Sequence, residues 1–339
     1  MPRKHEPFVI GDVSVLAGTQ KSVKLPAAKL YNDTPMDLHV EVIHGTKAGP
    51  VLLVCAAIHG DELNGIEICR RLLGRVNAKT LTGTLLIVPI VNVFGFIQQS
   101  RYLPDRRDLN RCFPGSAKGA LASRLAYLFA HSLVERATHI IDLHTGAIYR
   151  ENLPQIRCDT DDEVMLDMAN AFGAPVIMSS KAREGSMRAY ANSLNIPCIL
   201  YEAGEALRFS DMSIKSGLNG VINVIRYLNM TKGKIKTKTK ITSVNASRSY
   251  WVRSESDGLV NIKLKLGERV AKGQVLATIV NPFGGSPSQL LAPTDGIIVG
   301  NSNIPVTNEG EALFHIAQFS SDEIEIINDN LDDFMQEYA

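Results

Sequence analysis

Between residues 51 and 230 the chain alternates between two hydrophobic patterns. Short runs rich in Val and Ile are apolar at nearly every position, and the segments between them place apolar residues at helical spacing. Strands that are apolar on both faces are typical of a parallel sheet covered by helices on both sides. We therefore predict an α/β fold with a mixed, mostly parallel sheet flanked by helices. The predicted strands are 51–57, 85–91, 139–143 and 196–201, and the predicted helices lie within 64–76, 122–137, 161–172 and 217–230.

The two ends of the chain lack this alternation. Residues 1–50 read as short extended segments broken by Gly and Pro, and residues 245–318 are rich in Gly, Pro and β-branched residues. The second stretch contains two similar units of hydrophobic strands around a glycine turn, and it resembles a biotinyl/lipoyl-type barrel. That family attaches its prosthetic group to a lysine in the hairpin between the halves, but residues 280–293 contain no lysine. We expect a small all-β domain with a structural or site-shaping role.

Runs of charge separate and end these regions. Residues 231–240 contain five lysines and no apolar period, which indicates a solvated linker or an exposed strand. The last eighteen residues carry seven acidic groups and no basic one, and both a short amphipathic helix and a mobile tail fit them. We therefore expect three parts, which are 1–235, 245–318 and 319–339.

The overall composition narrows the possible partners. The 339 residues include 36 Lys and Arg and 35 Asp and Glu, so the net charge of +1 favours neither nucleic acid nor a membrane surface as a partner. The apolar runs are too short to span a bilayer, and the first residues lack a signal-peptide pattern. The five cysteines are scattered without a CxxC pair, which favours a reducing compartment. We expect a cytoplasmic protein.

Three of the predicted strands end on side chains that bind zinc or transfer protons. His59 and Glu62 follow the first strand, His144 follows the third, and Glu202 follows the fourth. The carboxyl ends of parallel strands share one edge of a sheet, where ligands bind. A lone His–Glu pair at this spacing also fits a surface ion pair, but three strand ends together favour a zinc site with an open fourth position. Glu202 is then the candidate general base.

A loop between these strands concentrates arginine. A guanidinium binds a carboxylate through two hydrogen bonds and can also neutralise a developing oxyanion. A solvated basic loop fits the same pattern, but the balanced charge of the whole chain favours a role in binding a carboxylated substrate. The loop spans residues 98–115 and contains Arg101, Arg106, Arg107 and Arg111, with Asp108 and Asn110 between them.

Four motifs in this order, HGDELNG, RDLNR, DLHTG and YEAG, resemble the succinylglutamate desuccinylase/aspartoacylase family of the zinc carboxypeptidase-like superfamily. The likeness covers most of residues 40–318, because family members also carry a small C-terminal β domain. It implies a zinc-carboxypeptidase-like catalytic domain that hydrolyses the amide bond of a small-molecule N-acyl amino acid. It also implies that His59, Glu62 and His144 bind one zinc ion per chain and that Glu202 is the catalytic carboxylate.

The resemblance also implies roles for the arginine loop. Arg101 looks like the arginine that polarises the scissile carbonyl, although its distance in sequence from the RDLNR motif is slightly longer than in aspartoacylases. Asn110 and Arg111 match the pair that holds the α-carboxylate of the substrate. Asp108 resembles the carboxylate that orients the first zinc-binding histidine.

Two other functions fit parts of the sequence. A zinc carboxypeptidase that acts on short peptides would use the same metal, base and carboxylate clamp. A binding or scaffold protein with a degenerate site would lack a ligand or the base, and all four residues are present. The acyl group, the amino acid and the oligomeric state, including a homo-oligomer, stay open.

Several residues near the motifs have alternative interpretations. Asp61 is expected to cap the following helix, since Asp favours helix starts. Asp142 fits either an orienting partner of His144 or an ordinary hydrogen-bonded carboxylate. Arg183 and Arg188 are expected at the surface, with recognition of a second carboxylate as the alternative, and Trp251 is expected in a core or an interface.

Overall fold

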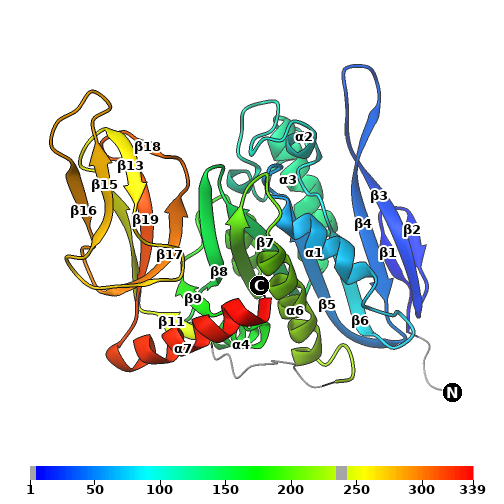
Figure 1. The fold of residues 1–339 in the computed structure, drawn as a ribbon. Helices are drawn as coiled ribbons and strands as arrows, with labels where there is room; N and C mark the ends of the chain where they lie inside the picture. Colours follow the sequence, from blue (N-terminus) through cyan, green and yellow to red (C-terminus); the bar gives the residue numbers. More distant parts are fainter. Residues whose placement is uncertain (1–4, 234–242, 339) are drawn as a thin grey trace.

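The computed structural model describes residues 5–233 and 243–338 (Figure 1). Within these residues, a sheet of thirteen strands runs through the molecule in the order β12–β19–β17–β8–β10–β7–β5–β6–β4–β3, with β9, β11 and β14 paired beside this path. The strands at the centre are parallel to one another. They are β10 (Cys198–Glu205), β7 (His139–Gly146), β5 (Lys47–Ala56) and β6 (Thr82–Val88). The predicted parallel strands are therefore confirmed, and they form the middle of a mixed sheet.

Antiparallel strands extend the centre in both directions. On one side, β4 (Pro35–His44) pairs with β6, and β3 (Thr19–Lys29) forms a long hairpin with β4. On the other side, β8 (Arg150–Cys158) runs antiparallel to β10 and parallel to β9 (Val176–Ser179). A separate hairpin consists of β1 (Phe8–Ile10) and β2 (Val13–Val15).

Both faces of the central sheet are buried, which explains the uniformly apolar strands. In β5, Leu53 belongs to one hydrophobic core and its neighbours Leu52 and Val54 belong to a second core on the opposite face. In β7, Ile140 and Ile141 divide between the same two cores. Successive side chains of a strand point to opposite faces, so a sheet between two helical layers needs apolar residues at every position.

The helices form these two layers (Figure 1). On one face, α1 and α4 pack against α6, and on the other face α3 covers the sheet near α5. Several helices begin at a capping side chain that accepts a hydrogen bond from the backbone, among them Asn92 for α2, Asp162 for α4, Ser186 for α5 and Ser210 for α6. The helices are α1 (Asn64–Leu73), α2 (Val93–Ile97), α3 (Leu121–Ser132), α4 (Glu163–Phe172), α5 (Met187–Ser193) and α6 (Asp211–Tyr227).

The region after residue 243 is all β up to residue 318, as predicted, and it joins the large sheet. β17 pairs with β8, so the antiparallel strands β17, β19 and β12 continue the sheet outward from the centre. A second sheet of four strands has the order β16–β15–β13–β18. The strands are β11 (Val244–Ala246), β12 (Arg248–Arg253), β13 (Gly258–Ile262), β14 (Arg269–Val270), β15 (Val275–Val280), β16 (Ser288–Leu291), β17 (Gly296–Ser302), β18 (Val306–Thr307) and β19 (Ala312–Gln318). The resemblance to a biotinyl/lipoyl-type barrel stays a prediction.

The acidic C-terminal segment is a helix, α7 (Ser321–Tyr338). It packs against α6 and β11, and Ile324, Ile327 and Leu331 join a hydrophobic core that includes Leu153 of β8. Of the two alternatives for this segment, the amphipathic helix is therefore confirmed. Most of the lysine-rich segment 231–240 lies outside the described residues. No helix in the described part of the chain is long and apolar enough to cross a membrane.

Two adjacent isoleucines of α7 provide a test of this packing. Ile327 is fully buried, whereas Ile326 is 48% exposed. We expect Ile327→Ala to lower the free energy of unfolding by about 2–5 kcal/mol, because it removes buried methyl groups and leaves a cavity. Ile326→Ala makes the same chemical change at the surface and is the matched control. Denaturant unfolding curves measure both, and equal effects of the two substitutions would contradict the packing of α7.

Candidate metal centre and active-site cavity

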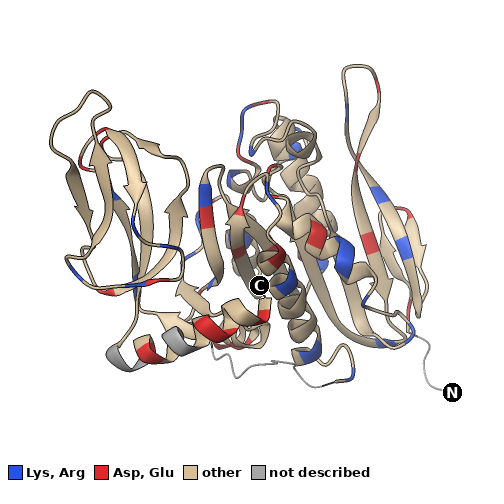
Figure 2. Ribbon diagram, in the orientation of Figure 1, with Lys and Arg blue, Asp and Glu red and all other residues tan. Residues whose placement is uncertain are grey.

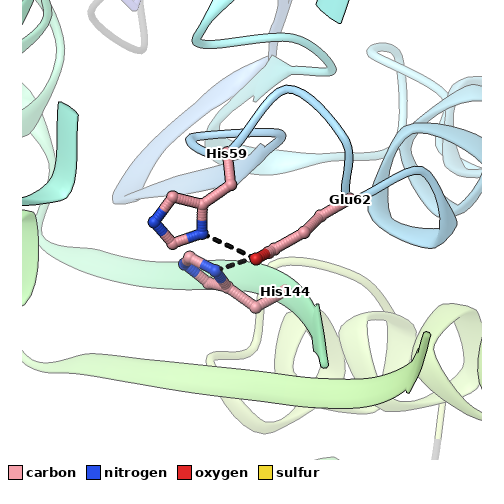
Figure 3. Close-up of side chains that lie close together, drawn as sticks. All are labelled: His59, Glu62 and His144. Atoms are coloured by element: carbon pink, nitrogen blue, oxygen red, sulfur yellow. Dashed lines mark hydrogen bonds and ion pairs between the residues drawn. The ribbon is translucent and has the colours of Figure 1, made fainter. Parts of the chain in front are cut away.

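Three predicted metal ligands lie together at the edge of the central sheet (Figure 3). His59 and Glu62 lie in the loop between β5 and α1, and His144 lies in the neighbouring strand β7. The Nδ1 atom of His59 is 2.6 Å from Oε1 of Glu62, and Nδ1 of His144 is 2.7 Å from Oε2. All three residues are buried, and their potential ligand atoms lie within 4.8 Å of one another. The sequence prediction that these residues meet is confirmed.

A close backbone contact holds the loop that carries two of these residues. Gly60 follows His59, and a Cβ atom placed on Gly60 would lie 1.9 Å from the carbonyl carbon of Gly95 in α2. Such a distance is impossible for a real side chain, so only glycine fits where the loop passes over α2. This contact fixes the direction in which His59 and Glu62 leave the sheet.

Aspartates contact the outer nitrogen of each histidine. Nε2 of His144 is 2.9 Å from Oδ2 of Asp142, and Nε2 of His59 is 3.3 Å from Oδ1 of Asp108. When an imidazole is neutral and its proton lies on Nε2, facing the carboxylate, its Nδ1 lone pair is directed at Glu62. Two nitrogen lone pairs and a carboxylate then converge on one small volume. A cation bound there would offset the repulsion between these electron-rich atoms. The described donor set therefore fits a metal ion with nitrogen and oxygen ligands.

The charges of these groups are strongly coupled. Burial disfavours the charged form of Glu62, but His59 and His144 outweigh burial and hold the pKa of Glu62 well below its usual value. Burial likewise opposes the charged form of His144, yet Asp142 and Glu62 raise its pKa well above the usual value. The backbone N–H of Thr145 donates a hydrogen bond of 3.2 Å to Oε2 of Glu62. The site therefore keeps Glu62 ionised, as a metal ligand must be.

The prediction that Asp61 caps α1 is wrong. The residue at the N-cap position is Leu63, and no side chain caps the helix. Asp61 is buried, and its Oδ1 has no hydrogen-bond partner among the described residues. Burial and the charge of Glu62 raise the pKa of this carboxyl group. The backbone carbonyl of Asp61 accepts a hydrogen bond of 2.8 Å from the N–H of Leu207, so Asp61 lies against the segment that follows β10.

The arginine loop places Arg101 beside the metal site. Its Nε and Nη2 atoms donate to Oδ2 of Asp108 at 3.2 and 2.9 Å, and Nη1 lies 3.2 Å from Nδ1 of His59. Nη1 is also 3.7 Å from Oε1 of Glu62. Asp108 therefore lies between Arg101 and His59, and its orienting role stays a prediction.

The same loop presents the predicted carboxylate clamp. Asp108 caps the short 3₁₀ helix Leu109–Arg111. Its side chain accepts a hydrogen bond of 2.9 Å from the backbone N–H of Asn110. Oδ1 of Asn110 accepts from the backbone N–H of Met187 at 2.9 Å, so the orientation of the amide is fixed. Asn110 and Arg111 both line the cavity described below. Arg106 and Arg107 are exposed and do not line it.

Glu202 faces the same cavity from β10. It lies opposite His144 in the parallel pair β10–β7, so both side chains project from the same face of the sheet. Its Oε2 atom forms an ion pair with Nε of Arg157, at 2.5 Å, from the neighbouring strand β8. The strand register thus places the predicted base beside the metal ligands without making it a member of the cluster.

A cavity of about 360 Å³ connects these groups. Basic side chains outnumber acidic ones in its lining, where Glu62 and Glu202 are the acidic members. Figure 2 shows basic positions at one end of β8 and in the loops beside α2. A cavity of this composition favours anionic ligands. The lining arginines are Arg101, Arg111, Arg150, Arg157, Arg183 and Arg188.

Arg188 differs from its expected position. It is 8% exposed, so the expectation of a surface residue is wrong, and its Nη1 atom has no hydrogen-bond partner within the described residues. Burial lowers the pKa of Arg188, with the nearby charge of Arg157 adding to the effect. Arg183 is exposed, as expected, but it also lines the cavity.

The all-β region contributes one wall of the cavity, in line with the site-shaping role expected for it, and Trp251 is a lining residue that was not predicted. Trp251 of β12 lines the cavity and stacks on His315 of β19, with ring centroids 4.5 Å apart and an angle of 4° between the planes. The guanidinium of Arg150 lies 5.3 Å from the centroid of the Trp251 ring. Burial, together with the charge of Arg157, lowers the pKa of His315 to about 3, so this wall carries no charge from its histidine.

Comparisons with known proteins agree with this geometry. Residues 48–228, more than half of the chain, match the model of the succinylglutamate desuccinylase/aspartoacylase catalytic domain. The chain belongs to this family. A curated relative, N-alpha-acetyl-L-2,4-diaminobutyric acid deacetylase of Halomonas elongata, is 27% identical over 282 residues, which cover 80% of this chain and 82% of the relative.

Solved structures of similar proteins share the fold. The product-bound ectoine utilization protein EutE (DoeB) of Ruegeria pomeroyi is 25% identical, with a TM-score of 0.80 over 89% of this chain and 95% of its own. A succinylglutamate desuccinylase of Silicibacter sp. TM1040 is 26% identical, with a TM-score of 0.79 over 88% of this chain and 94% of its own. The similarity therefore extends beyond the matched catalytic region into the C-terminal strands.

The contact at Gly60 predicts a defect in metal binding. We expect Gly60→Ala to push the His59 loop away from α2, and therefore to lower both the melting temperature and the affinity for zinc. Gly74→Ala is the matched control, because a Cβ at Gly74 would approach only the backbone oxygen of Arg71, at 3.8 Å. Thermal unfolding and titration of chelator-treated protein with zinc measure the two effects. Normal zinc affinity in Gly60→Ala would show that the loop position does not depend on this contact.

Proposed function

We propose that this protein is a zinc-dependent deacylase that hydrolyses the amide bond of an N-acyl amino acid. The observation that carries the proposal is the arrangement of His59, Glu62 and His144 opposite Glu202 in one cavity with basic walls. Membership of the succinylglutamate desuccinylase/aspartoacylase family supports the same reaction class. The proposal includes a cytoplasmic location and the division of the chain into a catalytic domain, 1–235, an all-β domain, 245–318, and a C-terminal acidic segment, 319–339.

Each chain would hold one zinc ion through His59, Glu62 and His144. A bound zinc ion polarises a carbonyl group and lowers the pKa of a water molecule to about 7. Asp108 and Asp142 keep the two imidazoles in the orientation that presents Nδ1, and their carboxylates increase the basicity of the rings. Three protein ligands leave room for a substrate or a water molecule, as in catalytic zinc sites.

The protein's own side chains transfer the proton, polarise the carbonyl group and bind the substrate. Glu202 accepts a proton from the attacking water and returns it to the nitrogen of the leaving amine. Arg101 lies close to the metal ligands and polarises the acyl carbonyl. Asn110 and Arg111 hold the α-carboxylate of the amino acid, with the amide of Asn110 fixed by Met187. The products are a carboxylic acid and a free amino acid.

The cavity suggests which amino acids the enzyme prefers. The relative from Halomonas elongata is named for a substrate derived from diaminobutyric acid, whose side chain carries an amine. In this chain that amine would face a cavity lined by six arginines and only two glutamates. Like charges repel, so the lining disfavours a cationic side chain and favours an anionic one.

Replacement of Glu202 tests the proposed base. We expect Glu202→Gln to reduce hydrolysis by about 10²–10⁴-fold, because it removes the proton acceptor while preserving the shape of the side chain. The zinc content, measured by mass spectrometry, should remain about one ion per chain. Glu268→Gln, at an exposed position of the all-β region, is the control and should leave the activity unchanged. Undiminished hydrolysis by Glu202→Gln would remove Glu202 from the mechanism.

A substrate panel tests the reaction class and the side-chain preference together. We expect kcat/KM to be higher for N-acetylaspartate, N-acetylglutamate or N-succinylglutamate than for N-acetyl-2,4-diaminobutyrate. The expected ratio is at least about tenfold, which corresponds to a difference of about 1.4 kcal/mol. Chromatographic detection of the released amino acid measures all substrates alike. Turnover of short peptides without turnover of acyl amino acids would instead support the zinc carboxypeptidase.

A further inference from the structure

The carboxylate of Glu202 depends on one partner. Its Oε2 atom has no hydrogen-bond partner, and the ion pair with Nε of Arg157 is the one ion pair that this carboxylate makes among the described residues. The metal ligands and Asp108 are connected through several short contacts, but none of these contacts includes Glu202. The proposed base therefore has a single side chain to orient it.

The strand register brings Arg157 to this position. β8 and β10 are antiparallel, with Gln155 opposite Glu202 and Arg157 opposite Leu200. Residues diagonal to one another in such a pair lie on the same face and within reach of long side chains. Arg157 and Glu202 are partly buried, with side-chain exposures of 25% and 18%. Limited exposure to water weakens the screening of their attraction.

Within the described part of the chain, no carboxylate besides Glu202 forms an ion pair with Arg157. Arg188 and His315 are close enough for the charge of Arg157 to affect their pKa values. Neither side chain is an anion, so neither can form an ion pair with Arg157. His315 stacks against Trp251, which closes this side of the cavity. Glu202 is thus the anion with which Arg157 pairs, whereas Arg101 pairs with Asp108.

We propose that Arg157 is a positioning residue that holds the Glu202 carboxylate in its working orientation beside the metal ligands. The inference rests on the proposed function of Glu202 as the general base. A glutamate side chain has several rotamers, and a base works only within hydrogen-bond reach of the proton that it removes. Arg157 acts through Glu202 and does not hold a carboxylate of the substrate.

The alternative role makes a different kinetic prediction. Arg157 lines the same cavity as five other arginines, so the alternative role is that it binds substrate. Loss of a substrate-binding group raises KM and does so whether or not Glu202 is present. Loss of a positioning residue lowers kcat and has no further effect once Glu202 has been removed.

A double-mutant cycle distinguishes the two roles. The zinc-loaded wild type, Arg157→Gln, Glu202→Gln and the double variant are assayed with the best substrate of the panel. We expect Arg157→Gln to lower kcat about 10–100-fold with KM changed less than about threefold. In the Glu202→Gln background, the same substitution should lower kcat less than about threefold. Zinc content and melting temperature are measured for each variant.

Controls separate this inference from the proposed function. Arg269→Gln, which removes an exposed arginine from its ion pair with Glu325, should leave kcat and KM unchanged. Arg157→Met, with an unbranched side chain, replaces Arg157→Gln in the cycle if that variant does not fold. Unchanged kcat in the Arg157 variant, or a rise in KM that persists without Glu202, would overturn the positioning role. Full activity of Glu202→Gln would instead overturn the proposed function itself.

Discussion

The candidate site depends on the burial of one carboxylate between two imidazole rings. Each oxygen of Glu62 lies within 2.7 Å of an Nδ1 atom, one from His59 and one from His144, and water has little access to any of them. A buried group of this kind is costly unless its charge is compensated. A metal ion would compensate it, and Asp108 and Asp142 orient both rings toward that position.

The fold concentrates these groups because parallel strands end at the same edge. β5 delivers His59 and Glu62, its neighbour β7 delivers His144, and β10 delivers Glu202 in register with His144. The antiparallel strand β8 then adds Arg157, and the all-β region adds Trp251. The rigid centre of the sheet fixes the reacting groups, while strands and loops at its margins shape the cavity around them.

The sequence predicted those site residues that directly follow a recognisable apolar strand. The metal ligands and Glu202 follow conspicuous apolar runs, so their strands and their common edge were predictable. Arg157 was missed because its strand, β8, contains Pro154 and alternates polar with apolar residues, as expected of a strand outside the parallel centre. Asp61 is buried and contacts Leu207 of the segment that follows β10, and sequence spacing does not reveal a contact between segments so far apart.

The central claim is that His59, Glu62 and His144 together hold zinc. X-ray diffraction from crystals of zinc-loaded protein, measured on both sides of the zinc absorption edge, tests this directly. The account predicts one anomalous peak per chain, at about 2.0–2.2 Å from the two Nδ1 atoms and a Glu62 oxygen. A zinc peak bound elsewhere on the chain, with this cluster empty at saturating zinc, would contradict it.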